Sequence, residues 1–169
     1  MSYEARAYAT IFPVLAPTYL SATINGDANP RYRFVKVPQF MEFRSTSVPA
    51  LGPKPYPEGT RYVLTAGHTK DGVTRTLEFV FPSKPQSMTY DLSKDSDDVR
   101  STYYSDPATG ELHVSVSGSL TVKYDDIEKT LNGIWSGSYD HGGVNGNEEF
   151  PITGEFVVNV DLSKKNNTD

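Results

Sequence analysis

The sequence predicts one all-β domain, an antiparallel β-sandwich of about nine or ten strands. Three observations support this fold class. Apolar and polar residues alternate with period two along most segments, helical periodicity is nearly absent, and turns rich in glycine or proline separate the segments at short intervals. A closed, lipocalin-like β-barrel has the same signature and is the alternative. We expect a single domain over residues 1–162, followed by a frayed polar tail at 163–169.

In the first third of the chain, alternation predicts four short strands and then a loop. The strands are expected at residues 3–12, 18–25, 31–37 and 40–44. Proline cannot donate a hydrogen bond to a β-ladder, so a proline-rich stretch at 48–59 predicts a long ordered loop. The prolines concerned are Pro49, Pro53, Pro55 and Pro57.

Two hairpins follow, and the sequence predicts the register of each. Asp71-Gly72 tolerates the positive φ angles of a type I′ turn and centres a hairpin over residues 61–81. The second hairpin turns at 106–110. The predicted pairs are Lys70 with Val73, Ala66 with Leu77, Leu64 with Phe79 and Tyr62 with Phe81, then Ser105 with Glu111, Tyr104 with Leu112 and Tyr103 with His113.

The clearest alternation lies at residues 112–123, where Gly118 interrupts the apolar row and predicts a bulge at a sheet corner. Gly154 likewise interrupts the apolar row of a last strand, which ends near residue 162. We also expect a short edge strand at 87–91 and one helical turn at 125–129. In the 112–123 strand, the predicted inward row is Leu112, Val114, Val116, Leu120 and Val122, which places His113, Ser115, Ser117, Ser119, Thr121 and Lys123 outward.

No motif in the sequence supports a catalytic or metal site. The acidic stretch 91–98 offers oxygen ligands that suit calcium, but it lacks the spacing of an EF-hand loop, and a solvated acidic loop is the simpler interpretation. The three histidines form no paired-ligand motif, and His68 and His113 are expected on outward faces. No serine lies in a nucleophile elbow. We therefore predict no enzyme, no metal and no cofactor.

The stretch 131–143 is the most suggestive for binding because its single tryptophan, Trp135, alternates with glycines and a tyrosine. Glycines beside an indole allow close packing in a core, which is the favoured interpretation. The same pattern could present an aromatic platform for a sugar or another flat ligand, next to a glycine-rich loop that begins at His141. The candidate ligand contacts are Trp135, Tyr139, His141 and Tyr103.

Five different short motifs follow one another along the chain. They are Ala22-Thr23-Ile24-Asn25-Gly26, Tyr90-Asp91-Leu92, Gly110-Glu111-Leu112, Leu131-Asn132-Gly133-Ile134-Trp135 and Ile152-Thr153-Gly154-Glu155-Phe156. In this order they resemble a family of small bacterial all-β proteins of uncharacterised function, many of them lipoproteins. The chain differs from that family in having no lipoprotein signal and in carrying Trp135 where phenylalanine is usual. The resemblance implies the fold and adds no chemistry.

Composition disfavours several kinds of partner. The formal net charge is −5 and the basic residues are scattered singly, so neither nucleic acid nor an acidic membrane surface is expected. The absence of cysteine excludes disulfides and thiolate chemistry. No apolar run is long enough for a signal peptide or a membrane span. We expect a cytoplasmic location by default, while export without a cleavable signal stays compatible with the sequence.

Three hypotheses about function remain. The first is a non-enzymatic binding domain whose loops at one end of the sandwich engage a small molecule, a glycan or a protein. The second is a self-associating protein that forms a homodimer through an edge strand such as 31–37 or 99–105. The third is a hydrolase or isomerase whose site is assembled only by folding, with a histidine in a cleft beside a carboxylate.

Overall fold

The computed structural model describes residues 17–26, 38, 40–106, 108, 110–140 and 149–163. The strands predicted at 3–12 and 31–37 lie outside these residues. None of the described residues belongs to a helix, so no helix among them is long and apolar enough to cross a membrane. The ten strands are β1 (Tyr19–Ile24), β2 (Met41–Arg44), β3 (Ala50–Tyr56), β4 (Gly59–Lys70), β5 (Val73–Phe81), β6 (Met88–Asp91), β7 (Arg100–Asp106), β8 (Glu111–Asp125), β9 (Thr130–Asp140) and β10 (Glu149–Asn159).

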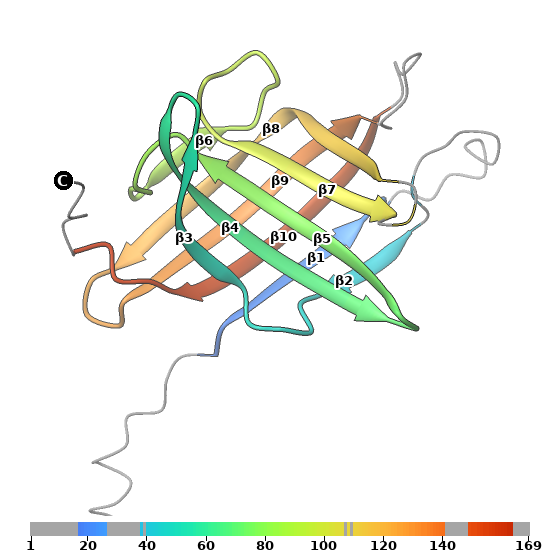
Figure 1. The fold of residues 1–169 in the computed structure, drawn as a ribbon, viewed down its shortest axis with the longest axis horizontal. Coiled ribbons are helices and arrows are strands. Elements are labelled where there is room, and N and C mark those ends of the chain that lie inside the picture. The colour runs from blue at the N-terminus through green and yellow to red at the C-terminus, as the bar shows by residue number, and fades with distance from the viewer. Residues whose placement is uncertain are drawn as a thin grey trace, which may run out of the picture.

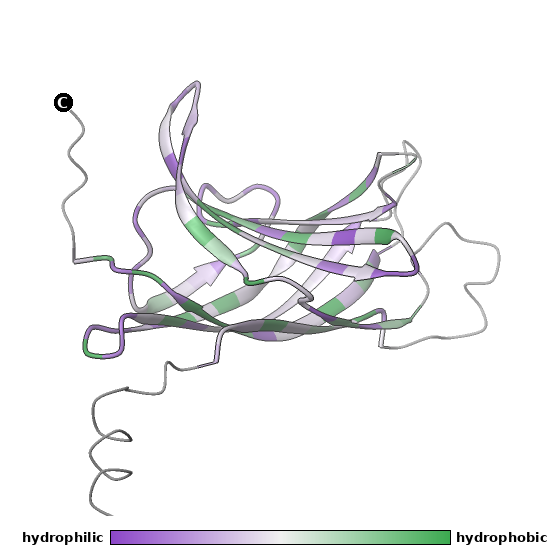
Figure 2. Cartoon of the chain, turned by 60° about the horizontal axis from the view of Figure 1, so that its bottom comes forward, coloured by the Kyte–Doolittle hydropathy of each residue, from purple (hydrophilic) through white to green (hydrophobic). Residues whose placement is uncertain are grey.

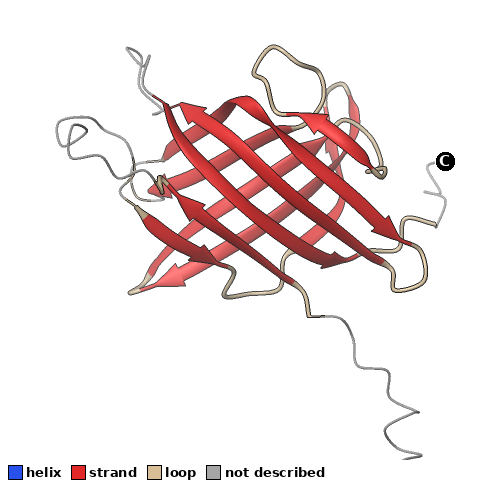
Figure 3. Cartoon of the chain, turned by 180° about the vertical axis from the view of Figure 1, so that it is seen from behind, coloured by secondary structure: helices blue, strands red, loops and turns tan. Residues whose placement is uncertain are grey.

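The all-β prediction is confirmed: the strands form one antiparallel sheet that folds over on itself as a sandwich (Figures 1 and 3). The strand order is β2-β1-β10-β9-β8-β7-β5-β4-β3, and β6 pairs with β8. We call β3, β4, β5, β7 and the start of β8 the β4 layer, and the remaining strands the β9 layer. The sheet does not close into a barrel, although Thr46 N–H donates to Gly67 O across the gap between its ends (2.9 Å).

The predicted register of the β4–β5 hairpin is confirmed at every pair. Lys70 opposes Val73 and Leu64 opposes Phe79. Asp71 and Gly72 have φ angles of 53° and 76°, which a type I′ turn requires at both central positions. The short strand expected at 87–91 is β6. Strand β7, in contrast, lies between β5 and β8, so the expectation that 99–105 forms an edge strand is wrong.

The loop predicted at 48–59 is also wrong, because residues 50–56 form strand β3 and pair with β4. Strand β3 is the last strand of the sheet, so one of its sides has no partner strand. Pro53 and Pro55 are two residues apart, and their nitrogens therefore lie on the same side of the strand. An edge position tolerates both prolines without the loss of a ladder bond, and it discourages pairing with another chain.

A bulge in β8 reverses the inward and outward faces predicted for its first half. Ser115 pairs with Tyr139 and Ser117 with Ser138, so Val116 is one extra residue in the ladder. Beyond the bulge Leu120 and Val122 face the core, as predicted. Before it the pattern is inverted, and the predicted faces there are wrong. His113 and Ser115 are buried, whereas Leu112 and Val114 lie on the outer face. A bulge produces this result because one inserted residue shifts a period of two by half.

The core joins the two layers through large aromatic side chains. The Phe79 ring meets the Trp135 ring edge-on, with 4.9 Å between centroids, and lies 5.8 Å from the Phe156 ring. Gly154 faces Trp135 across the β9–β10 ladder, and a Cβ atom at Gly154 would lie 2.6 Å from the indole ring. The predicted core position of Trp135 is therefore confirmed, but the glycine packed against its ring belongs to β10 and lies outside the stretch 131–143. Figure 2 shows the two layers facing each other, with hydrophobic positions along the strands of both.

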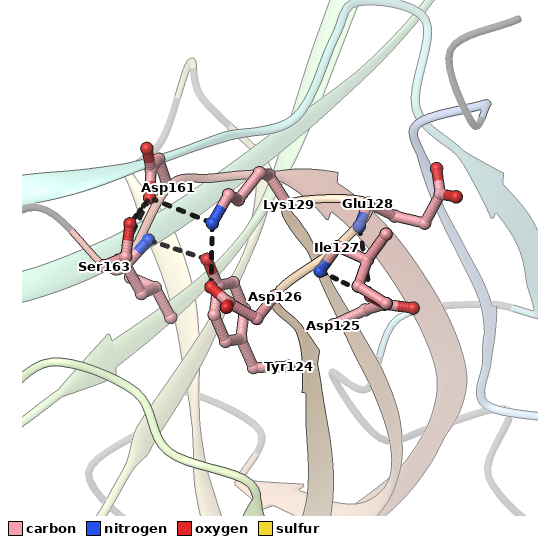
Figure 4. A network of polar contacts seen from close by, with 9 residues as sticks. Tyr124, Asp125, Asp126, Ile127, Glu128, Lys129, Asp161 and Ser163 are labelled. Carbon is pink, nitrogen blue, oxygen red and sulfur yellow. Dashed lines mark hydrogen bonds and ion pairs between the residues drawn. The ribbon is translucent and has the colours of Figure 1, made fainter. Parts of the chain in front are cut away.

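The turn at 125–129 contains no helix and is held by side-chain hydrogen bonds (Figure 4). Asp125 Oδ1 accepts from the backbone N–H groups of Ile127 and Glu128, at 2.9 and 3.0 Å. These two bonds lower the pKa of Asp125. The Lys129 ammonium lies 2.8 Å from Asp126 and 4.0 Å from Asp161. The turn is thereby tied to the segment that follows β10.

Candidate functional site

A groove of about 490 Å³ crosses the outer face of the β4 layer, and described residues line it. The turn between β3 and β4 rises from the layer and forms one wall (Figure 2). The loop between β6 and β7 forms the opposite wall. We call this feature the outer groove. Its lining residues are Tyr56, Glu58, Arg61, Glu78, Val80, Ser96, Asp97, Asp98, Arg100, Thr102, Tyr104, Leu112 and Val114.

The floor of the outer groove carries four apolar or aromatic side chains beside the polar Glu78 and Thr102, although the wet face of an antiparallel sheet is usually polar. Leu112 is 41% exposed there, beside Val114, Val80 and Tyr104. The β8 bulge is the reason, because it turns the apolar row of β8 away from the core and toward the groove. A groove that combines apolar side chains with polar and charged groups is typical of a small-molecule binding site.

Two tyrosines lie together in this groove. Tyr56 is 38% exposed at the end of β3, and Tyr104 is half-buried on β7. Burial raises the pKa of Tyr104, and the nearby Glu78 and Tyr56 raise it further. The two phenols and the Glu78 carboxylate all line the groove. Together they offer aromatic faces with hydrogen-bonding groups beside them.

The acidic wall is a loop that folds on its own side chains. Asp91 Oδ1 accepts from the backbone N–H of Ser93 (2.8 Å) and from its hydroxyl (2.6 Å), and these bonds lower the pKa of Asp91. Asp98 Oδ2 accepts from Asp91 N–H at 3.1 Å. Leu92 N–H donates to Gly118 O at 3.0 Å, so the loop is anchored on the β8 bulge. Among the described residues no three histidine, aspartate or glutamate side chains are placed to hold a metal ion.

The four candidate contacts named from the sequence do not form one surface. Trp135 is 2% exposed and Tyr139 is fully buried, so both belong to the core. The Trp135 indole N–H lies near the Tyr139 hydroxyl, but in a geometry too poor for a hydrogen bond. Tyr103 is also buried, and its hydroxyl donates to the Met41 sulfur (3.4 Å) at the wall of a second cavity. His141 lies outside the described residues.

The second cavity, of about 590 Å³, lies between the layers at the end of the sandwich where the β4–β5 and β7–β8 turns meet. We call it the end cavity. Both polar and apolar side chains line it. They are Pro38, Phe40, Met41, Lys70, Asp71, Val73, Arg75, Tyr103, Ser105, Asp106 and Glu111.

Both described histidines have positions that the sequence did not predict. His113 is fully buried, and its ring meets Phe150 edge-on at 5.0 Å. His68 is half-buried against Phe43, with 5.4 Å between ring centroids, and its Nδ1 lies 2.6 Å from Arg44 O. The outward orientation expected for both is wrong. For His113 the cause is the bulge, whereas His68 continues the inward row of Leu64 and Ala66 in a step of two, so alternation along β4 itself places its ring on the core face.

Alkaline pH should destabilise the protein through its buried tyrosines. Burial raises the pKa of Tyr103 from 10.0 to about 12 and raises that of Tyr139 as well. The unfolded chain ionises first, so the stability contributed by these phenols is complete below pH 10 and is lost as the pH rises toward 12. We expect Tyr103→Phe to reduce the slope of unfolding free energy against pH in this window, with little change at neutral pH. Urea titrations at several pH values measure the slope, and an unchanged slope would contradict the prediction.

Comparison of the chain with protein-family models, with curated proteins and with solved structures found no match. The resemblance to small bacterial β proteins therefore stays a prediction. Function must be argued from the geometry of the two cavities.

Proposed function

We propose that the protein is a binding domain whose outer groove holds a sugar or amino sugar. The observation that supports this proposal is the inverted face of β8. The bulge places Leu112 and Val114 outward, in the groove, and sequence patterning that fails locally is often a sign of a functional surface. The site differs from the one expected at first, because it lies on the face of a layer and uses loops only as its walls.

The size of the groove favours a small ligand. Its volume of about 490 Å³ falls within the usual range for small-molecule sites, roughly 300–1,000 Å³. A stable protein partner would need on the order of 800 Å² of surface from each side. The rising β3–β4 turn and the acidic loop would obstruct a flat partner of that size.

The chemistry of the groove favours a ligand with one apolar face and several hydroxyl or amino groups. The tyrosine rings and the apolar side chains of the floor suit the C–H face of a pyranose ring. The rim carries four carboxylates and two guanidinium groups, and Glu58 and Arg61 lie 3.7 Å apart as an ion pair. Acidic groups outnumber basic ones, so an amino sugar fits the rim better than an acidic sugar. The rim residues are Glu58, Glu78, Asp97, Asp98, Arg61 and Arg100.

A thermal-shift screen followed by calorimetry tests the proposal. The screen contains neutral, amino and acidic sugars together with lipids, nucleotides and divalent ions. We expect a sugar to raise the melting temperature, because a ligand that binds only the folded state stabilises it. Removing one stacked ring, as in Tyr56→Ala or Tyr104→Ala, should weaken binding about tenfold.

The matched control is Tyr19→Ala. Tyr19 is also half-buried on an outer face, but it lies on β1, where its hydroxyl donates to Glu155 (3.1 Å). This variant should keep the affinity of the unmodified protein. A screen in which no sugar binds, or in which Tyr56→Ala and Tyr19→Ala have equal effects, would refute the proposed site. The homodimer expected through an edge strand stays a separate prediction, which light scattering over a concentration series can test.

A further inference from the structure

The end cavity contains a serine and a histidine in hydrogen-bond contact. Ser105 Oγ lies 2.7 Å from His113 Nε2, and His113 Nδ1 lies 2.8 Å from the main-chain oxygen of Asp140. A carbonyl oxygen only accepts hydrogen bonds, so Nδ1 carries a proton. In the neutral imidazole Nε2 is then the acceptor, and the Ser105 hydroxyl donates to it. This is the order of groups that activates a serine nucleophile: hydroxyl, base and an acceptor that orients the base.

Two bulges create this arrangement. Tyr104 pairs with Leu112 and Asp106 pairs with Glu111, so Ser105 is an extra residue in β7 and does not face Glu111 as predicted. The bulge in β8 turns His113 inward. The sequence pattern does not show that Ser105 and His113 meet, because their contact depends on one bulge in each of two strands.

The surroundings hold the imidazole in place. Its ring stacks against Tyr103, with 5.9 Å between centroids, and meets Phe150 edge-on. Asp140 is itself fixed, because its carboxylate accepts from Val114 N–H at 3.1 Å. His113 is fully buried, whereas Ser105 is half-buried and lines the end cavity. A reactant in the cavity therefore reaches the hydroxyl while the base stays shielded from water.

We propose that Ser105 is an activated nucleophile that accepts an acyl group from an ester bound in the end cavity. The Ser105 oxygen attacks the carbonyl carbon and its proton passes to His113 Nε2. The bond from that carbon to the alkoxy oxygen breaks, and the departing alcohol takes the proton from His113. Water then attacks the acyl carbon and gives a proton to His113 Nε2; the bond from that carbon to Ser105 Oγ breaks, Oγ takes the proton from His113, and a carboxylic acid leaves. The step needs no reactant besides the ester and water.

The lining of the cavity indicates the class of ester. Met41, Phe40 and Val73 supply apolar surface for a short acyl chain. Lys70 and Arg75 line the same cavity, and the charge of Arg75 is close enough to act on the Tyr103 phenol. Asp71, Asp106 and Glu111 line it too, so carboxylates outnumber cations there, and an ester with a short apolar acyl chain and no anionic group matches this combination. The site is separate from the outer groove and does not depend on it.

Labelling with a fluorophosphonate probe, followed by peptide mass spectrometry, tests the proposal. We expect the probe to modify Ser105 at least about 100-fold faster than Ser138, because general-base assistance contributes factors of that order or more. Ser138 is the internal control: its hydroxyl donates to the Glu149 carboxylate, also at 2.7 Å, with no imidazole present. Hydrolysis of p-nitrophenyl butyrate should be lost in Ser105→Ala and retained in Ser138→Ala.

A purely structural role for the pair predicts a different result. If Ser105 only satisfies a buried imidazole, the probe modifies Ser105 and Ser138 at similar rates, or modifies neither, and the proposal is overturned. His113→Gln should slow labelling of Ser105 about 100-fold in a variant that keeps its near-ultraviolet circular dichroism. If that variant does not fold, the ratio of the two labelling rates in the unmodified protein decides alone.

Discussion

Replacing Gly118 with alanine should destabilise the protein by about 4 kcal/mol or more, because backbone strain and overpacking add at this position. Gly118 has a φ of +126°, which residues with a Cβ atom rarely adopt. A Cβ atom there would lie 2.2 Å from Ser136 O and 2.6 Å from the Gly137 Cα. Both atoms belong to the backbone of β9, so the clash cannot be relieved by a side-chain rotation. The expected relief is separation of β8 from β9 at the bulge.

Gly59→Ala is a matched control for this variant. Gly59 has a φ of +125°, but nothing lies within 4 Å of the position that a Cβ atom would occupy there. Backbone strain alone should lower the free energy of unfolding of this variant, by roughly 1–3 kcal/mol. Changes in the entropy of the unfolded chain are the same in both variants and cancel. Urea denaturation gives both free energies, and equal losses would show that the contact between Gly118 and β9 carries no energy.

The β8 bulge also shows how far the sequence predicts this fold. Gly118 marks a bulge in the sequence, and the structure has one between Ser115 and Ser117. The sequence does not reveal that the extra residue inverts every face before it. Alternation alone places Leu112 inward and His113 outward, and each of these assignments is reversed. Register across a turn is predictable where the turn type is specified, as at Asp71-Gly72, because a two-residue turn leaves no freedom.

The candidate sites were less predictable than the fold, for the same reason. The outer groove is lined by residues from β3, β4, β5, β7 and β8 together. The pairing of β3 with β4 was not predicted, because Pro53 and Pro55 indicated a loop there. The contact between Ser105 and His113 requires a bulge on each of two strands. One available signal was missed: the bulge predicted at Gly118 lies inside the alternating segment 112–123, so the same alternation cannot hold on both sides of it. A strand whose length spans a predicted bulge should be assigned separately on each side of it.

Trp135→Ala should cost about 3–5 kcal/mol of stability, the usual range for removing a large aromatic side chain from a core. Trp135 is 2% exposed, and its ring lies between Phe79 of the opposite layer and Phe156 of its own. Gly154 lies against the same ring and has no side chain that could fill the space. The cavity therefore stays open, and its cost adds to the lost burial of apolar surface.

Ile134→Ala is the control on the same strand. Ile134 is 66% exposed on the outer face of β9, so its truncation should change stability by no more than about 0.5 kcal/mol.

Trp135→Phe adds a test of the alternative role as an aromatic platform. A core residue loses roughly 1–2 kcal/mol of stability on this change, through lost volume alone, because the indole N–H makes no hydrogen bond. A platform residue would instead lose ligand affinity at unchanged stability. Urea denaturation of the three variants, combined with sugar titrations, separates the two roles: an unchanged free energy of unfolding in Trp135→Ala would remove the indole from the core.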